Sequence, residues 1–165
     1  MANKRYLLDS NIFIAAARQY YRFEFAPGFW KCLEEHGKTG RVQSVDRVKD
    51  ELLRGKDDLA EWAKNVFGDA FASTGDSDVL ATFGRIMSWA QSQSQFMDAA
   101  KAEFAGCADG WLVAYAKVHG LVVVTQELFS ADARKRVLIP NVCKAFDVEY
   151  VNTWEMLQAL GAKLG

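Results

Sequence analysis

Several residue patterns that often mark a function are missing from this sequence. Cysteine occurs three times, widely spaced and without a Cys-x-x-Cys pair, and histidine occurs twice. Dispersed, odd-numbered cysteines argue against a disulfide scaffold or a zinc ribbon and are typical of a reducing compartment. The sequence also has no glycine-rich phosphate loop and no nucleophile–histidine arrangement with an orienting acid. These absences argue against P-loop enzymes and against serine or cysteine hydrolases.

Long apolar runs and a strong net charge are also lacking. No run approaches the roughly 20 apolar residues of a membrane span, and the first residues do not resemble a signal peptide. We therefore expect a soluble, cytoplasmic protein that does not contact a membrane. The formal net charge is −1, so any nucleic acid must be bound through local basic patches. With 50% hydrophobic residues, the 165 residues can form a single domain, 1–165.

Short apolar segments alternate with helical patterns along the chain. Leu121-Val122-Val123-Val124-Thr125 is β-branched without polar alternation, which predicts a central parallel strand that is buried on both faces. Other strands are predicted at 5–8, 41–45 and 148–151, and an amphipathic helix at 56–72. Such alternation predicts an α/β domain with a mainly parallel central sheet flanked by helices.

Helix boundaries are marked by local residue types. Asp46 is a predicted N-cap for the helix that follows the second strand, because its side chain can accept a backbone hydrogen bond. His36 and His119 each precede a glycine at a predicted helix end, where glycine favours the left-handed turn. An imidazole suits the negative end of a helix dipole, so both histidines are interpreted as capping residues.

Polar side chains follow the two most apolar strands. Asp9, Ser10 and Asn11 come directly after the first strand, and Thr125 and Glu127 end the strand at 121–125. The carboxyl ends of parallel strands meet at one edge of a sheet, where ligands bind in α/β folds. We therefore expect Asp9 and Glu127 to lie at the same edge.

Two further acids can reach this edge from helices. Glu51 borders the apolar face of its predicted helix, and Asp109 lies in the first turn of an apolar helix that ends at Gly120. Each has an ordinary alternative, since Glu51 could be a solvated surface residue and Asp109 could serve only the helix dipole. Carboxylates gathered in one cleft repel one another unless a cation neutralises them. Hard oxygen ligands favour Mg²⁺ or Mn²⁺, and such ions promote attack of water on phosphodiesters.

The chain resembles the PIN domain family in four ordered segments. These are Leu7-Leu8-Asp9-Ser10-Asn11, Val48-Lys49-Asp50-Glu51-Leu52, the stretch from Ala108-Asp109-Gly110-Trp111 to Ala116, and Val123-Val124-Thr125-Gln126-Glu127. The resemblance spans essentially the whole chain and is strongest to a PIN-like subfamily filed as a domain of unknown function. Relatives include the VapC-type toxins of bacterial toxin–antitoxin pairs.

This resemblance implies a three-layer PIN-like fold and a metal-dependent endoribonuclease. Its metal-binding and catalytic acids would be Asp9, Glu51, Asp109 and Glu127, with Mg²⁺ or Mn²⁺ as cofactor. Ser10, Asn11 and Thr125 would support them. Glu127 departs from the family pattern, in which aspartate or asparagine is common. The resemblance also implies a cognate antitoxin as partner, frequent dimerisation and an RNA substrate.

RNA contact would require cationic side chains near these acids. The residues expected to hold phosphate are Arg18, Arg22, Arg134, Lys135 and Arg136, and each could equally be a solvated surface charge. Two alternative interpretations stay open. The chain could be a non-catalytic PIN-like module that binds RNA or protein, or a different α/β phosphate enzyme. The haloacid dehalogenase type would require a second aspartate at position 11, where this chain has Asn11.

Overall fold

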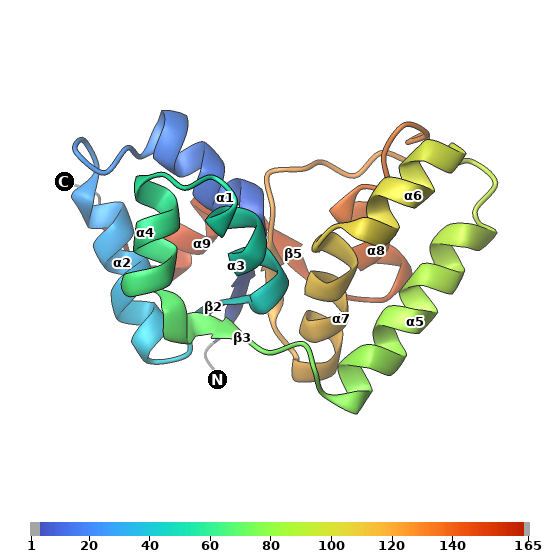
Figure 1. Cartoon of the computed structure of the whole chain (residues 1–165), viewed down its shortest axis with the longest axis horizontal. Helices are drawn as coiled ribbons and strands as arrows, with labels where there is room; N and C mark the ends of the chain where they lie inside the picture. The colour runs from blue at the N-terminus through green and yellow to red at the C-terminus, as the bar shows by residue number, and fades with distance from the viewer. Residues whose placement is uncertain (1–3, 164–165) are drawn as a thin grey trace.

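The computed structural model describes residues 4–163 and contains a five-stranded parallel sheet (Figure 1). The strand order is β3-β2-β1-β4-β5, and all four neighbouring pairs are parallel. The strands are β1 (Tyr6–Leu8), β2 (Val42–Val45), β3 (Phe71–Ala72), β4 (Val122–Val124) and β5 (Tyr150–Val151). The α/β class and the parallel sheet predicted from the sequence are confirmed.

Helices cover both faces of this sheet. Figure 1 shows α2, α4 and α9 on one side and α5 to α8 on the other, which gives three layers. Within residues 4–163 the α-helices are α1 (Ser10–Ala15), α2 (Pro27–Lys38), α3 (Asp46–Leu53), α4 (Asp58–Asn65), α5 (Ser77–Ser92), α6 (Asp98–Gly106), α7 (Asp109–His119), α8 (Ile139–Ala145) and α9 (Thr153–Leu160). A π-helical turn, η1 (Ala16–Tyr20), continues α1, and a 3₁₀ turn, η2 (Gly68–Ala70), precedes β3.

The two most apolar strands lie side by side at the centre of the sheet. Leu7 of β1 pairs with Val123 of β4, and both side chains are fully buried. Burial on both faces is the outcome that an uninterrupted β-branched run predicts, because helices cover each side. The buried apolar side chains of the described residues form one continuous cluster.

The helix predicted at 56–72 is wrong in its second half. α4 ends at Asn65, and the chain then forms η2 and the edge strand β3, which pairs with β2 through Ser44 and Phe71. The apolar spacing of this segment is compatible with a helix, so periodicity alone does not reveal β3. Long-range strand pairing decides its conformation here.

Two predicted helix boundaries also need correction. Val45 is the N-cap of α3, and Asp46 is the first residue of this helix. The Asp46 carboxylate instead accepts hydrogen bonds from the backbone N–H and the hydroxyl of Thr74, at 3.1 and 2.8 Å. α2 continues through Gly37 to Lys38, and the left-handed turn falls on Gly40, with φ of 79°. At the end of α7, Gly120 is left-handed as predicted, and His119 lies 3.1 Å from Asp76.

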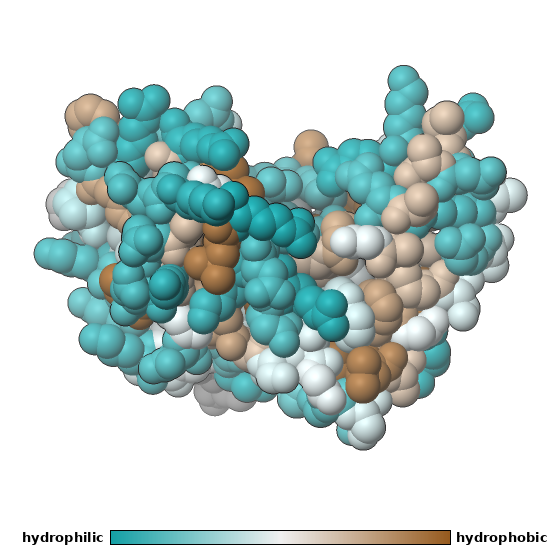
Figure 2. All heavy atoms as spheres, viewed as in Figure 1, coloured by the Kyte–Doolittle hydropathy of each residue, from teal (hydrophilic) through white to brown (hydrophobic). Residues whose placement is uncertain are grey.

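The surface of the molecule is indented between its two groups of helices. Figure 2 shows the surface hollowed at the top, between the two groups of helices. No helix within residues 4–163 is long and apolar enough to cross a bilayer.

Candidate functional site

Asp9 lies at the carboxyl end of β1, in the position that the sequence predicts. Its backbone N–H donates to Val124 O at 3.1 Å, which continues the pairing of β1 with β4 by one residue. Asp9 occupies the N-cap position of α1, yet its side chain accepts no capping hydrogen bond from that helix. The residue is 2% exposed, and its Oδ2 atom has no hydrogen-bond partner among the described residues. A buried carboxylate oxygen without a donor is costly, so an external partner would stabilise it.

Glu51 connects α3 to the beginning of α7. Its Oε2 atom accepts a hydrogen bond from the backbone N–H of Ala108 at 3.1 Å. Ala108 is the N-cap of α7 and provides no side-chain cap of its own. Glu51 therefore caps a helix that is distant in sequence and is not a freely solvated surface residue. Asp109, in the first turn of α7, is left without a capping hydrogen bond of its own.

Glu127 closes the loop between β4 and α8. The Thr125 hydroxyl accepts the backbone N–H of Glu127 at 3.1 Å, and Glu127 Oε1 accepts the backbone N–H of Ile139 at 2.9 Å. Its other oxygen, Oε2, lies 3.6 Å from the Arg136 guanidinium and is a buried atom without a hydrogen bond within residues 4–163. The longer side chain of glutamate thus allows the Glu127 carboxylate to bind the backbone of Ile139, the first residue of α8.

Four carboxylates lie close enough together for their charges to raise the pKa values of Asp9 and Asp109. Burial raises the pKa of Asp9 well above its usual range, and the charges of Asp109, Glu127 and Glu51 raise it further. The pKa of Asp109 is raised to about 7, first by burial and then by Glu127 and Glu51, while Arg136 opposes the shift. Acids from β1, α3, α7 and the loop after β4 therefore form one cluster, which we call the acidic cluster. Strongly perturbed carboxylates in a cleft are typical of functional sites.

The donors of the acidic cluster suit a hard cation. All are carboxylate oxygens, the ligands that Mg²⁺ and Mn²⁺ prefer, and two buried oxygens of Asp9 and Glu127 lack hydrogen bonds. Within the described part of the chain, no three histidine, cysteine, aspartate or glutamate side chains are arranged to hold an ion together. Mg²⁺ usually keeps several waters and takes one or two carboxylates, so the donor chemistry fits a partly hydrated ion.

Two cysteines border the acidic cluster and are held as neutral thiols. The pKa of Cys107 is raised to about 12, mainly by burial and then by the charge of Asp109. The pKa of Cys143 is also raised to about 12, by burial and by Glu127. A thiol needs a lowered pKa to act as a nucleophile. Both cysteines therefore argue against cysteine chemistry at this edge of the sheet.

The supporting residues predicted from the sequence have distinct surroundings. Ser10 is buried and its hydroxyl donates to Asp9 Oδ1 across a long 3.4 Å contact. Thr125 is buried and orients Glu127 as described above. Asn11 is exposed and lines a cavity beside the acidic cluster. The structure places all three at the sheet edge, and their roles stay predictions.

The basic residues proposed to hold RNA fall into two groups. Arg136 faces the acidic cluster, because it pairs with Glu127 and lowers the pKa of Asp109. Arg134 and Lys135 are exposed on the same loop. Arg18 lines the cavity next to Asn11, and the Arg22 Nε atom donates to the carbonyl of Arg18.

Sequence reasoning missed two residues that shape this edge. Ser44 is fully buried, and its hydroxyl donates to the carbonyl of Leu8 at 2.6 Å, directly before Asp9. Asn141 accepts from the backbone of Ser130 and donates to it, at 3.2 and 2.7 Å, and so braces the loop after β4. The available signal was a polar residue inside an apolar segment, which requires an internal partner when it is buried.

The parallel sheet and the acids at its carboxyl edge define an α/β domain with a PIN-like fold. Solved structures share this fold. "Structure of FitAB bound to IR36 DNA fragment" aligns with a TM-score of 0.55 and 22% identity over 90% of this chain and 95% of that chain. FitAcB from Neisseria gonorrhoeae aligns with a TM-score of 0.55 and 23% identity, over 90% and 98%.

A third solved structure, VapBC2 from Rickettsia felis bound to a DNA fragment from their promoter, aligns with a TM-score of 0.54 and 16% identity, over 89% and 97% of the two chains. The sequence matches the family described as "Domain of unknown function (DUF4411)" over residues 6–164, and the chain belongs to that family. No curated protein matches it.

Proposed function

We propose that this protein is a metal-dependent endoribonuclease. The observation that carries the proposal is the acidic cluster at the carboxyl edge of a PIN-like sheet, where the neighbouring carboxylates raise the pKa values of Asp9 and Asp109. Such a concentration of negative charge is unfavourable unless it serves to bind a cation.

The residues that would hold Mg²⁺ or Mn²⁺ are Asp9, Glu51, Asp109 and Glu127. The bound ion would activate water and stabilise the charge that develops during attack on a phosphodiester. Asp9 supplies a buried oxygen without a competing hydrogen bond. Glu51 and Glu127 fix the neighbouring helices through the backbone of Ala108 and Ile139. Burial and the neighbouring acids raise the pKa of Asp109 to about 7, and a bound cation would favour its charged form.

The biological role we propose is that of the toxin in a bacterial toxin–antitoxin pair. The resemblance to VapC-type toxins and the similarity of fold to FitAB and VapBC2 support it. On this proposal the substrate is RNA, the partner is an antitoxin protein, the toxin can form a homodimer, and all of them meet in the cytoplasm. Growth arrest on expression, relieved by a neighbouring gene product, is the expected result. Unimpaired growth at full expression would contradict the toxin role.

A nuclease assay with two matched variants tests the enzymatic proposal. We expect the purified protein to cleave RNA in Mg²⁺ or Mn²⁺ and to stop when EDTA is added. Asp9→Asn keeps the size of the side chain but removes its charge, so cleavage should fall by roughly 100-fold or more, since even partners of metal ligands cost about 10- to 100-fold. Asp58→Asn, the same change at an exposed position of α4, is the control and should cleave normally. Normal cleavage by Asp9→Asn would refute the proposal.

One observation favours a second candidate, a PIN-like module that binds RNA or protein without cleaving. No three ligating side chains within residues 4–163 are arranged to hold an ion together. RNA binding without turnover in Mg²⁺, Mn²⁺ or any other divalent metal would favour this candidate. Release of phosphate from small phosphomonoesters would instead favour a different α/β phosphate enzyme.

A further inference from the structure

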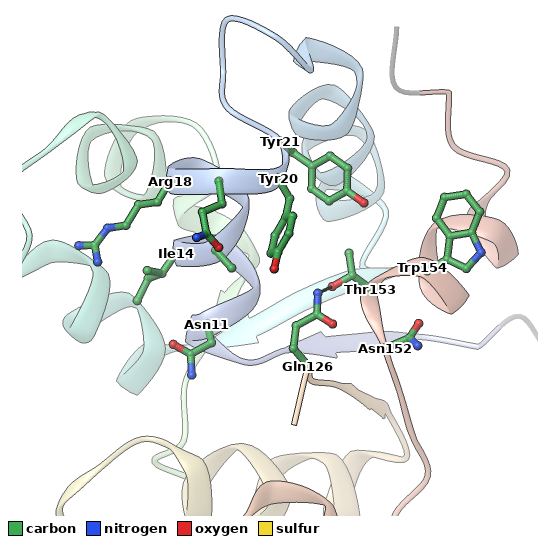
Figure 3. A pocket seen from close by; sticks show the side chains of 11 residues that line it. Asn11, Ile14, Arg18, Tyr20, Tyr21, Gln126, Asn152, Thr153 and Trp154 are labelled. Atoms are coloured by element: carbon green, nitrogen blue, oxygen red, sulfur yellow. Dashed lines mark hydrogen bonds between the residues drawn. The ribbon is translucent and has the colours of Figure 1, made fainter. Parts of the chain in front are cut away.

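A large cavity lies beside the acidic cluster. Its volume is about 780 Å³, within the roughly 300–1,000 Å³ of small-molecule sites. Three segments form its walls: α1 with the π-helical turn η1, the residue after Thr125, and the start of α9 (Figure 3). Asn11 belongs both to this wall and to the turn that carries Asp9, so a ligand in the cavity would extend toward the acids.

We propose that this cavity binds a nucleotide of single-stranded RNA next to the cleavage site. The inference rests on the proposed ribonuclease function, because it takes RNA as the ligand of the same sheet edge. It adds a binding site for the base and its phosphate, separate from the acids themselves.

The charge of the cavity is opposite to that of the acidic cluster. Its eleven lining residues include one cation, Arg18, and no aspartate or glutamate. Arg18 forms no ion pair with any residue between 4 and 163, so its guanidinium is free to bind a phosphate. Figure 3 shows Arg18 at one side of the cavity, pointing away from the tyrosines. Phosphate and base would therefore be held at different places.

Aromatic rings provide surfaces on which a base can stack. Tyr20 is 66% exposed and Trp154 is 58% exposed, although both border the cavity. Figure 3 shows Tyr20 pointing into the cavity, toward the Gln126 and Thr153 side chains. Exposed rings of this size are unfavourable in water, and base stacking on such rings stabilises single-stranded nucleic acid complexes by about 1–3 kcal/mol per base. The lining of the cavity thus offers two exposed rings for a base and, at its other side, one cation for a phosphate (Figure 3).

The wall that carries Tyr20 is fixed before any ligand binds. Tyr21 stacks on Phe29 with ring centroids 4.5 Å apart, and the Tyr21 carbonyl accepts the Trp30 indole N–H at 2.6 Å. The turn η1, which contains Tyr20, is π-helical, a rare conformation that is often found at functional sites. Preorganisation lowers the entropy cost of binding.

Amide groups at the base of the cavity can read the edge of a nucleobase. The Gln126 amide nitrogen donates to the Thr153 hydroxyl at 3.0 Å, which fixes the orientation of that amide. The exposed Asn11 amide also lines the cavity and can donate or accept a hydrogen bond. RNA-binding proteins combine aromatic stacking with such hydrogen bonds to unpaired bases.

Binding measured without cleavage tests the inference. The probe is a fluorescein-labelled single-stranded RNA octamer of mixed sequence, followed by anisotropy in EDTA. Tyr20→Ala and Trp154→Ala should each weaken binding by about 5- to 160-fold, the range for loss of one base stack. Phe25→Ala is the matched control, because Phe25 is 76% exposed in the same region but lies outside the cavity. It should bind like the wild type.

Two further measurements make the test independent of folding. Arg18→Gln should reduce the slope of log affinity against log salt by about 1, while Lys64→Gln, an exposed cation on α4, should leave it unchanged. RNA that contains 5-iodouridine should crosslink to the wild-type protein at a peptide with Tyr20 or Trp154. Crosslinks exclusively elsewhere would overturn the inference, as would wild-type affinity in both aromatic variants.

The outcomes separate this inference from the proposed function. If the wild type cleaves RNA but the cavity variants bind it normally, the cavity inference fails and the ribonuclease stands. If the wild type binds RNA through the cavity but never cleaves it, the ribonuclease fails and the cavity inference stands. A peptide that binds the cavity while RNA affinity is unchanged in its variants would assign it to a protein partner and overturn our inference.

Discussion

Helix α1 connects two regions that differ in how well their buried groups are satisfied. One is an aromatic cluster, and the other is the acidic cluster. The α1 residue Phe13 enters the aromatic cluster with Trp62 and Phe67, whose ring centroids lie 5.9 and 5.7 Å from that of Phe13. The polar atom of Trp62 is also satisfied, since its indole N–H donates to Glu34 at 3.1 Å. The residue before α1, Asp9, enters the acidic cluster with an unpartnered buried oxygen. The aromatic region therefore stabilises the folded state, whereas the unpartnered oxygen and the like charges of the acidic cluster destabilise it.

The largest expected effect is in the aromatic cluster. Phe13 is fully buried among rings, so Phe13→Ala should lower the free energy of unfolding by about 3–5 kcal/mol through lost burial and a cavity. Urea denaturation of both proteins measures this difference. A loss below about 1 kcal/mol would show that the cluster contributes no more than an average surface contact.

The next effect is in the acidic cluster and depends on pH. The folded pKa of Asp109 is about 7, whereas an unfolded aspartate titrates near 3.9. Between these values the folded chain holds more protons, so the free energy of unfolding should fall as pH rises from about 4 to about 7, by up to about 1.4 kcal/mol per unit of pKa difference. Asp109→Asn should flatten this dependence in urea denaturation.

Binding of a divalent ion should restore the free energy of unfolding that is lost as the pH rises. If the acidic cluster binds Mg²⁺, the melting temperature should rise with Mg²⁺ at pH 8 and change less at pH 5, where protonation competes with the ion. Asp109→Asn should weaken the rise at pH 8. An equal rise in wild type and variant would show that the ion acts elsewhere.

The smallest expected effect distinguishes packing from helix propensity. A Cβ at Gly37 of α2 would come within 2.8 Å of the Phe67 ring, whereas a Cβ at Gly84 of α5 would meet nothing within 4 Å. Gly84→Ala should therefore stabilise the protein by up to about 1 kcal/mol, and Gly37→Ala should destabilise it by about 1 kcal/mol. Thermal denaturation of the pair suffices. Stabilisation by both substitutions would show that the Phe67 ring can move to accommodate the added methyl group at little cost in free energy.

The regular parts of the fold were predictable because local pattern and tertiary environment agree. The run at 121–125 is apolar, and the structure buries it between two parallel neighbours. A local signal also marks the start of α9, where Asn152 and Glu155 form a capping box. β3 was not predictable, because two residues cannot show a strand period and only pairing with β2 makes them a strand.

The sequence indicates which acids are candidates for the site, but not the hydrogen bonds and ion pairs that these acids form. Element ends and the family resemblance point to Asp9 and Asp109, whereas no local signal shows that Glu51 caps α7 or that Glu127 reaches the backbone of Ile139. Arg136 shows the same limit, because its distance of 3.6 Å from Glu127 depends on how the loop before α8 folds back. The metal and the roles of these residues stay predictions.

The placement of the first strand at the middle of the sheet also governs how the protein is made. Leu7 leaves the ribosome well before its partner Val123 is synthesised. Contacts between residues so distant in sequence form slowly. Since Glu127 follows β4, a growing polypeptide cannot assemble all four acids until β4 and the loop after it have been synthesised.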